Sequence, residues 1–361
     1  MTSATARPIR AIFDSAALRH NHAVARHHAG SARLWSVVKA NAYGHGLERT
    51  VAALADVADG FALIELEAAM VLREAGLRHP ILMLEGCYSA EELPSFAEYH
   101  LTPVFHRLAQ VDEFCALALP VRLPVYLKLN TGMNRLGLDA AELAAALDKL
   151  AYSSSADSIT LMTHFADADG ERGVAWQMAR FDAMCAGRSL PRSLANSAAL
   201  IRFPEACGDW ARPGIMLYGS TPFADRSAED LGLRPVMTLE SELIAVRDLA
   251  AGEHVGYGCI FTAERPMRIG VVAGGYADGY PRHASTGTPI LVDGQRTRTL
   301  GRVSMDKMCV DLTELPDAGV GDTVTLWGNG LSVDEVAAAA GTIGYELLCA
   351  LADRVPIIEA E

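Results

Sequence analysis

The sequence lacks the patterns typical of metal-binding, secreted and membrane-spanning proteins. Its 7 cysteines are scattered along 361 residues without a CxxC pair, and its 11 histidines follow no metal-ligand spacing. Residues 1–10 contain no apolar signal-peptide core, and no run of about 18 apolar residues occurs. We therefore expect a cytoplasmic protein with reduced thiols, no bound metal and no membrane span.

Positive charge is also scarce. The chain carries 31 Lys and Arg against 44 Asp and Glu, which gives a formal net charge of −13. Such a balance disfavours nonspecific binding to nucleic acid or to anionic membranes, so we expect neither as a partner. A Gly-rich GxGxxG turn after the first long strand is missing too, which counts against a doubly wound dinucleotide-binding sheet.

Strand-like and helix-like segments alternate over the first 220 residues or so. Amphipathic runs such as 47–58 and 140–151 separate the candidate strands. The expected strands are Leu34–Val38, Phe61–Ile64, Pro80–Leu84, Thr102–Phe105, Pro124–Leu129, Ser158–His164, Ser193–Asn196 and Ile215–Tyr218. This alternation predicts an α/β chain with an N-terminal (β/α)8 barrel over residues 9–228.

The pattern changes after residue 228, where short strands separated by tight turns replace the helices. Expected strands are Leu239–Arg247, Arg268–Val272, Thr288–Val292, Arg296–Leu300, Met308–Asp311 and Thr323–Trp327. They predict a C-terminal, mainly antiparallel β domain over residues 229–361, with two helices near its end. Ile9–Phe13 reads as one more short strand, followed by a helix that Asp14-Ser15 caps.

A lysine stands where the first barrel strand ends, in the run from Leu34 to Gly46. The strand is apolar and β-branched, and Lys39 is followed by small and turn-forming residues. A lysine in that position is partly desolvated, and its amine can attack a carbonyl group. On position alone a structural, salt-bridged lysine is the more common role, so the other strand ends must decide.

Those strand ends carry several more polar side chains. The catalytic site of a parallel barrel lies at the C-terminal ends of its strands. The side chains expected there are Tyr43, Lys128, Arg135, His164, Ser197 and Arg212. Their positive charge suits an anionic ligand, and Ser197 with the amides of Gly214 and Ile215 fits a barrel phosphate site. Taken singly, Ser197 fits a helix cap equally well, and His164 is more often a core histidine.

A reactive lysine beside a phosphate site suggests pyridoxal phosphate, which forms a Schiff base with lysine and acts as an electron sink. A lyase or aldolase would also use a barrel lysine, so the second domain matters. Three of its runs, 255–258, 275–280 and 301–306, set an aromatic or charged residue among glycines. Such glycines permit close approach to a ligand or another chain, or simply form tight turns.

Taken together, these residues resemble one family, the bacterial alanine racemases, which are fold-type III pyridoxal-phosphate enzymes. The resemblance extends from Val37 to Val355. It rests on the runs 38–46, 128–135, 196–197, 212–219, 275–279 and 301–306. It implies interconversion of L-alanine and D-alanine by two bases on opposite faces of Cα, either supplying D-alanine for peptidoglycan or catabolising it.

The resemblance also assigns roles to single residues. Lys39 would be the Schiff-base lysine and one base, and Tyr257 the opposite base, contributed by the second subunit of a homodimer. Arg212 would face the pyridine nitrogen, which must then accept and stay unprotonated because a guanidinium only donates. The phosphate ligands would be Tyr43, Ser197, Gly214, Ile215 and Tyr345, with His164 and Arg212 as cationic neighbours of the tyrosine base. Met305 would offer its amide to the substrate carboxylate, a carbamylated Lys128 would hold Arg135, and Tyr276, Arg282, Arg302 and Asp306 would line the access corridor.

The chain departs from the family pattern at two places. Asn130 stands where many members carry Asp, and the Arg and Tyr usual after Pro356 are missing. Three other functions remain as alternatives at this point. They are a racemase acting on other amino acids such as serine, a fold-type III decarboxylase, and a non-catalytic pyridoxal-phosphate-binding protein. The runs 275–279 and 301–306 do not fit a decarboxylase, and the β domain argues against the non-catalytic binder.

Overall fold

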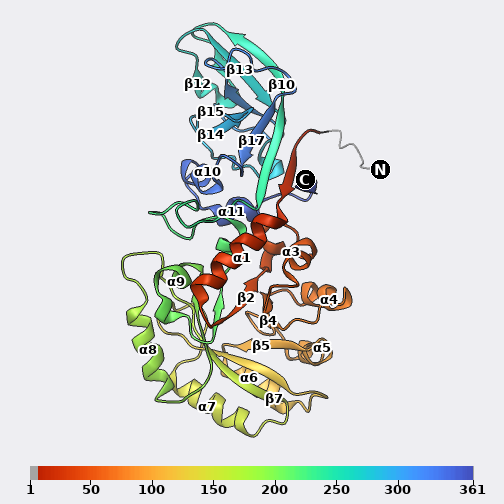
Figure 1. Ribbon diagram of the computed structural model, residues 1–361, viewed down its shortest axis with the longest axis vertical. Helices are drawn as coiled ribbons and strands as arrows, with labels where there is room; N and C mark the ends of the chain where they lie inside the picture. The colour runs from red at the N-terminus through yellow and green to blue at the C-terminus, as the bar shows by residue number, and fades with distance from the viewer. Residues whose placement is uncertain (1–6, 361) are drawn as a thin grey trace.

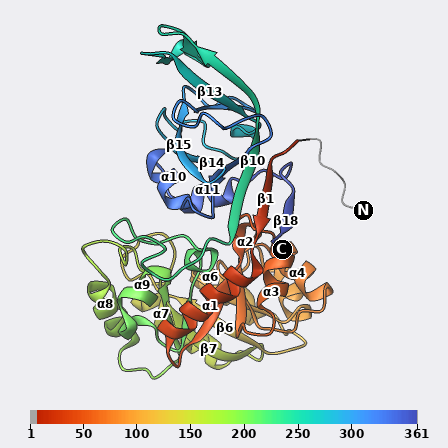
Figure 2. The ribbon, with the colours of Figure 1, turned by 45° about the horizontal axis from the view of Figure 1, so that its top comes forward.

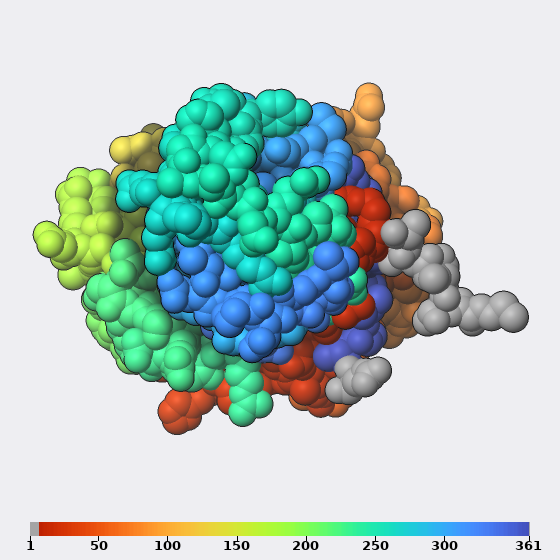
Figure 3. Space-filling model, turned by 90° about the horizontal axis from the view of Figure 1, so that it is seen from above, coloured from red at the N-terminus to blue at the C-terminus, as the bar shows by residue number. Residues whose placement is uncertain are grey.

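Two β structures are stacked in this protein, a closed parallel barrel and a mainly antiparallel sheet above it (Figure 1). The computed structural model describes residues 7–360. Seen from above, the C-terminal domain covers the centre of the molecule, and barrel segments emerge around its edge (Figure 3). The predicted fold class, a (β/α)8 barrel followed by an antiparallel β domain, is confirmed.

The barrel consists of eight parallel strands, and β2 closes it by pairing with β9. Its strands are β2 (Arg33–Val37), β3 (Gly60–Leu63), β4 (Ile81–Met83), β5 (Leu101–Phe105), β6 (Leu123–Lys128), β7 (Ala156–Met162), β8 (Arg192–Asn196) and β9 (Trp210–Arg212). Helices cover the outside, so most strand residues are buried on both faces. At the closing seam Trp35 stacks on Trp210 with ring centroids 4.2 Å apart.

Nine α-helices lie in the described part of the barrel domain. They are α1 (Ser15–Ala29), α2 (Lys39–Tyr43), α3 (Leu47–Leu54), α4 (Leu66–Glu74), α5 (Leu93–Glu98), α6 (Leu108–Ala116), α7 (Ala140–Ala151), α8 (Ala175–Cys185) and α9 (Ser197–Arg202). The predicted run 140–151 is α7, and the run 47–58 contains α3, which ends at Leu54. The predicted bounds of α7 are confirmed because a capping box fixes its start. Asp139 Oδ1 accepts from the Glu142 amide at 2.8 Å, and Glu142 accepts from the Asp139 amide at 2.9 Å.

The expectation that Ile215–Tyr218 forms the eighth barrel strand is wrong. The strand is β9, which ends at Arg212, and Ile215–Tyr218 forms the 3-10 turn η3. Pro213 lacks the amide that a ladder needs, and Gly214 then turns the chain with φ −121° and ψ −93°. The run is buried, and a short buried apolar run cannot be distinguished from a strand by periodicity.

The upper sheet has the strand order β13-β16-β15-β14-β17-β10-β1-β18. Its strands, with the small β11–β12 hairpin, are β10 (Met237–Leu249), β11 (His254–Val255), β12 (Phe261–Thr262), β13 (Met267–Val272), β14 (Pro289–Val292), β15 (Gln295–Leu300), β16 (Met308–Asp311), β17 (Thr323–Trp327) and β18 (Ile357–Glu359). Helices α10 (Val333–Ala339) and α11 (Gly344–Cys349) follow β17. Strand β10 pairs with β17 over residues 239–242 and with β13 over residues 243–249, and the β13 pairing contains a register shift between Leu243 and Ala245.

Strand β1 (Arg10–Phe13) belongs to the upper sheet, as the family pattern implied. It runs antiparallel to β10 and parallel to β18 (Figure 2). The unit that the sequence places at residues 9–228 therefore begins with a strand of the other sheet. The expected pairing of residues 1–8 concerns mostly residues 1–6, which lie outside the described part. Within residues 7–360, no helix is both long and apolar enough to cross a membrane.

Candidate active site

Lys39 stands directly before a turn of left-handed helix. The four residues that follow it, Ala40 to Tyr43, have φ between 52° and 54°. Non-glycine residues avoid this region at a cost of roughly 1–2 kcal/mol each, so the turn stores strain beside the candidate reactive amine. Strain of this kind persists where the surrounding structure over-determines the backbone, and it concentrates at functional sites.

His45 and Tyr218 hold this turn in place. The buried Nδ1 of His45 lies 3.0 Å from the Ala42 carbonyl and 2.9 Å from that of Tyr43. Burial lowers the pKa of His45 to about 4, so the ring is neutral and its Nδ1–H donates to these carbonyls. Tyr218 stacks on Tyr43 with centroids 4.7 Å apart, and its hydroxyl donates to the Val37 carbonyl. The strained turn is therefore anchored to η3 on its inner side.

Four of the five expected phosphate ligands gather beside this turn. The Gly214 amide donates to Ser197 Oγ at 2.9 Å, and Ile215 follows in η3. A Cβ on Gly214 would lie 2.5 Å from the Tyr43 hydroxyl, so only glycine leaves room there. The fifth ligand, Tyr345, approaches Tyr43 with centroids 6.1 Å apart. Burial raises the pKa of both tyrosines, which keeps their hydroxyls protonated and able to donate to an anion.

Arg212 is buried at the end of β9 and held by four hydrogen bonds. Its terminal nitrogens donate to the Ser193 carbonyl at 2.7 Å and hydroxyl at 2.8 Å, and to the carbonyls of Thr163 and Leu194 at 2.6 and 3.2 Å. Burial lowers the pKa of Arg212 to about 10, so the guanidinium remains charged at neutral pH. These bonds fix its plane and, among the described residues, leave Nε for a ligand.

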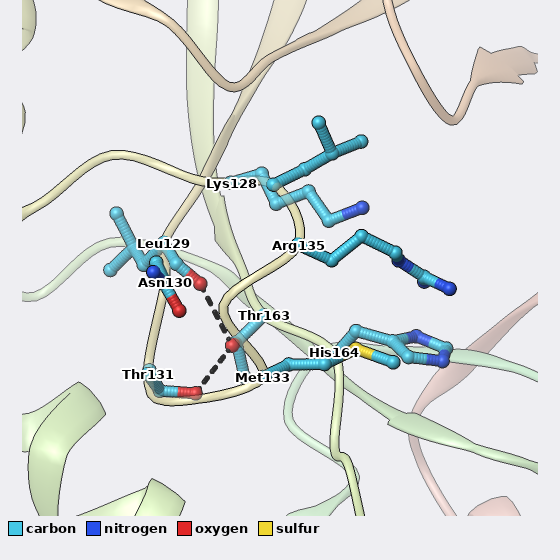
Figure 4. Close-up of a pocket in the computed structure, with 9 residues that line it drawn as sticks. Lys128, Leu129, Asn130, Thr131, Met133, Arg135, Thr163 and His164 are labelled. Carbon is cyan, nitrogen blue, oxygen red and sulfur yellow. Dashed lines mark hydrogen bonds between the residues drawn. The ribbon is translucent and has the colours of Figure 1, made fainter.

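A second group of basic side chains lies on the β6 side of the barrel mouth. Lys128, Arg135 and His164 extend in the same direction from neighbouring segments (Figure 4). Lys128 is buried at the end of β6, whereas Arg135 is exposed. Burial, together with the charges of Arg212 and Arg135, lowers the pKa of the Lys128 amine to about 8. A fraction of this amine is therefore uncharged near neutral pH.

Below these side chains, threonine and asparagine hydrogen bonds fix the loop between Lys128 and Arg135. Thr163 Oγ1 donates to the Leu129 carbonyl at 2.9 Å and contacts Thr131 Oγ1 at 2.7 Å (Figure 4). Asn130, the departure from Asp, accepts from the amides of Gly132 and Asn134, each at 3.1 Å. A carboxylate could also accept these two bonds, but Asn130 Nδ2 donates to Asn134 Oδ1 at 3.1 Å, a bond that an Asp at this position could not make.

His164 does not supply the positive charge that the resemblance assigned to it. Burial is the main cause that lowers its pKa well below the ordinary value, and Arg212 and Lys128 add to the effect. Its imidazole is neutral at physiological pH. Of the two expected cationic neighbours of the tyrosine base, only Arg212 carries charge.

The loops at 275–279 and 301–306 lie against each other in the upper domain. The Tyr276 and Ala277 amides donate to the Ser304 and Met305 carbonyls at 3.1 and 3.0 Å. A Cβ on Gly275 would lie 2.2 Å from the Ser304 oxygen, so this glycine permits the close approach. Within the described chain the Met305 amide donates to no acceptor, which leaves it for a ligand. Of the expected corridor residues, Tyr276, Arg282 and Arg302 are exposed and Asp306 is half-buried.

Tyr257 is not assembled with Lys39 in a single chain. It lies in η4 (Tyr257–Cys259), just before β12, in the domain above the barrel (Figure 1). The side chain is 71% exposed, and within residues 7–360 it makes no hydrogen bond to the barrel. A tyrosine left this exposed on a separate domain is available to another chain.

Sequence reasoning missed Asp278 and Arg354, which lie beside the Met305 loop. Asp278 is fully buried and pairs with Arg7 and Arg354. The signal was present, because a carboxylate inside a Gly-rich run that packs closely must find a cationic partner. Its partners are more than 70 residues away in the sequence, so they could not be named.

Comparison with known proteins places this geometry in a family. The profile described as "Alanine racemase, N-terminal domain" matches residues 13–222, and "Alanine racemase, C-terminal domain" matches residues 236–359. The chain belongs to the alanine racemase family. The alanine racemase of Thiobacillus denitrificans is 58% identical over 354 residues, covering 98% of this chain and 96% of that protein. The Nitrosospira multiformis alanine racemase is 55% identical and covers 97% and 98%.

Solved alanine racemase structures share the whole architecture. The biosynthetic alanine racemase of Pseudomonas aeruginosa matches with a TM-score of 0.96 at 49% identity, covering 98% of this chain and all of that one. A relative from Salmonella typhimurium at 50% identity is named a catabolic alanine racemase. The predicted family is therefore confirmed, and the protein is an isomerase that racemises alanine. This family membership excludes the alternatives of a fold-type III decarboxylase and of a non-catalytic pyridoxal-phosphate-binding protein.

Proposed function

We propose that the protein racemises alanine with pyridoxal 5'-phosphate and two bases, Lys39 and Tyr257. The observation that supports the cofactor is the close packing around Gly214. A Cβ there would fill the space beside the Tyr43 hydroxyl, and the Ser197 hydroxyl accepts a hydrogen bond from the Gly214 amide. Protonated tyrosine hydroxyls and an adjacent charged guanidinium suit a phosphate-bearing ring. These residues fit the group.

In this proposal Ser197, Tyr43 and Tyr345, with the amides of Gly214 and Ile215, hold the phosphate, and Lys39 holds the cofactor covalently. The Gly214 amide would exchange its bond to Ser197 Oγ for one to the phosphate. His164, being neutral, packs beside the ring. When bound, the cofactor supplies an electron sink that acidifies the Cα–H of the substrate. Arg212 would face the ring nitrogen as a hydrogen-bond donor only, so that nitrogen would accept and stay unprotonated, which would keep the electron sink weak. That arrangement favours reprotonation at Cα over transamination.

Racemisation needs a proton removed from one face of Cα and returned on the other. Lys39 Nζ serves one face, and the Tyr257 hydroxyl serves the opposite face. A tyrosine ordinarily titrates near pH 10, so it needs a positive neighbour, and Arg212 is the charged one. The exposed position of Tyr257 supports a homodimer in which each tyrosine completes the partner's barrel mouth.

The remaining roles follow the same geometry. The free Met305 amide binds the substrate carboxylate together with Arg135. The uncharged form of the Lys128 amine adds to CO2 and releases one proton to solvent, which gives a carbamate whose negative charge holds Arg135. Tyr276, Arg282, Arg302 and Asp306 line the corridor through which alanine passes. We also propose that residues 229–361 form the C-terminal domain.

Proton exchange in deuterium oxide tests the two-base proposal. The purified holoenzyme is given L-alanine, and loss of Cα–H is followed together with formation of D-alanine. We expect both, with Tyr257→Phe slowing one direction of exchange more than the other. Exchange without D-alanine would leave a single working base and contradict the proposal. A cofactor-loaded protein that shows neither would contradict the activity itself.

A further inference from the structure

We propose that Arg354 is a positioning residue for the reaction, which acts through Asp278 and Asp306 to hold the Met305 amide in place. This inference rests on the proposed function, which assigns that amide to the substrate carboxylate. Nothing in the resemblance assigned a role to Arg354 or Asp278.

Asp278 is the fixed point of this arrangement, because its side chain is fully buried, accepts three hydrogen bonds and pairs with a second arginine. Arg7 donates twice, at 2.7 and 2.9 Å, and Arg354 Nε lies 2.8 Å from Asp278 Oδ1 in an ion pair. The Gly275 amide adds a bond of 3.0 Å. Burial would raise the pKa of Asp278, but these donors outweigh it, so the pKa is lowered and the carboxylate stays ionised.

Arg354 connects this carboxylate to the loop that carries Met305. While Nε is paired with Asp278, a terminal nitrogen donates to Asp306 Oδ1 at 2.7 Å. Asp306 is the next residue after Met305 in the chain. A planar guanidinium has its donors in a rigid fork, so it fixes the spacing between two carboxylates in a way that a lysine cannot.

Met305 is therefore held from two directions. Its carbonyl accepts from the Ala277 amide at 3.0 Å, one residue before Asp278. Its neighbour Asp306 is tied to Arg354. Both attachments lead to the same buried carboxylate, so the Met305 peptide plane is fixed relative to Asp278 while its amide remains free. A ligand that needs this amide meets a preorganised donor.

The contribution of the Arg354–Asp306 ion pair to folding stability does not account for its presence. The Arg354 and Asp306 side chains are 40% and 43% exposed, and ion pairs with that exposure contribute little to folding. The same pair beside a ligand-binding amide has a geometric effect, because a small displacement of a binding group weakens catalysis strongly.

Steady-state kinetics of the holoenzyme with Arg354→Gln tests the proposal. We expect KM for L-alanine to rise on the order of tenfold, with kcat changed much less, because an interaction present in both ground and transition states is weakened. The inhibition constant of propionate, which keeps the carboxylate of alanine and lacks its amine, should rise in parallel. Arg354→Lys keeps the charge but not the fork, and should recover only part of the affinity.

Two variants serve as comparisons. Arg298→Gln removes an ion pair with Asp311 in the same domain, and should leave KM and propionate inhibition unchanged. Asp306→Asn should raise KM as Arg354→Gln does, and the double variant should add little more. Unchanged KM and propionate inhibition in folded, dimeric Arg354→Gln would overturn the positioning role. Wild-type protein that does not racemise alanine would instead overturn the proposed function.

Discussion

The Gly214 amide donates a hydrogen bond of 2.9 Å to Ser197 Oγ, which fastens the loop after β9 to the first turn of α9. The Tyr43 hydroxyl faces the same glycine, so one loop lies between the serine and the tyrosine. Three segments that are far apart in the sequence therefore meet around a space with no room for another methyl group.

Gly214→Ala should lower cofactor affinity at least about tenfold, because the new Cβ would meet the Tyr43 hydroxyl at 2.5 Å and displace it. Gly319→Ala is the matched control, since its Cβ would meet nothing within 4 Å and its φ is not positive. Fluorescence titration of the apoprotein with pyridoxal phosphate measures the difference. Equal affinities in the two variants would show that this loop is not the phosphate cradle.

Ala40→Gly should leave the free energy of unfolding nearly unchanged. Glycine relieves the left-handed strain at Ala40, about 1 kcal/mol, but loses a similar amount to its greater unfolded-state freedom. The same change at Ala145, inside the right-handed helix α7, should cost about 1 kcal/mol. Urea unfolding of the two apoproteins provides the comparison. Equal destabilisation at both sites would mean that the turn is not left-handed in solution.

In CO2-free buffer Lys128 should make stability rise with pH over a defined window. Its pKa is about 8 in the folded chain and 10.5 ordinarily. Below pH 8 both states bind the proton and the burial cost is fully present. Between these values the unfolded state binds more protons, so stability rises, by up to about 3 kcal/mol.

Lys128→Met should remove that rise, whereas Lys149→Met, which breaks an exposed pair with Asp112, should keep it. Urea unfolding from pH 7 to pH 11 measures the difference between the curves. Adding bicarbonate to the wild type should flatten its curve as the amine becomes a carbamate. A wild-type curve parallel to that of Lys128→Met would mean that this amine has an ordinary pKa.

Mixing inactive Lys39→Ala with inactive Tyr257→Phe should restore about a quarter of the wild-type activity. Random exchange makes about half of the dimers mixed, and each mixed dimer has one site with both bases intact. Each variant incubated alone under the same exchange conditions is the control. If exchange is verified and no activity returns, Tyr257 works within its own chain.

Much of the fold was predictable because its signals are local. The buried strand before Lys39 and the capping box at Asp139 need only neighbouring residues to be recognised. The eighth barrel strand failed for a physical reason. Its three residues are too few to show a pattern, while the apolar run after Pro213 imitates a strand.

The candidate site was predictable as a set of side chains and not as an electrostatic environment. Lys39, Ser197 and Arg212 follow strand ends, so the barrel architecture brings them to one mouth. The neutral state of His164 depends on burial and on nearby cations, which three-dimensional packing alone determines. The left-handed turn after Lys39 was also hidden, because alanine and tyrosine give no sign of positive φ and the single asparagine between them does not predict four such residues in a row.

Because β1 pairs with β10, two neighbouring strands of one sheet are synthesised at very different times. Arg10 and Glu240, which face each other in this pair, are 230 positions apart. A ribosome adding about 5–20 residues per second needs roughly 10–50 s to cover that distance. The last barrel strand, β9, ends at Arg212. All eight barrel strands are therefore synthesised before β1 can pair with β10.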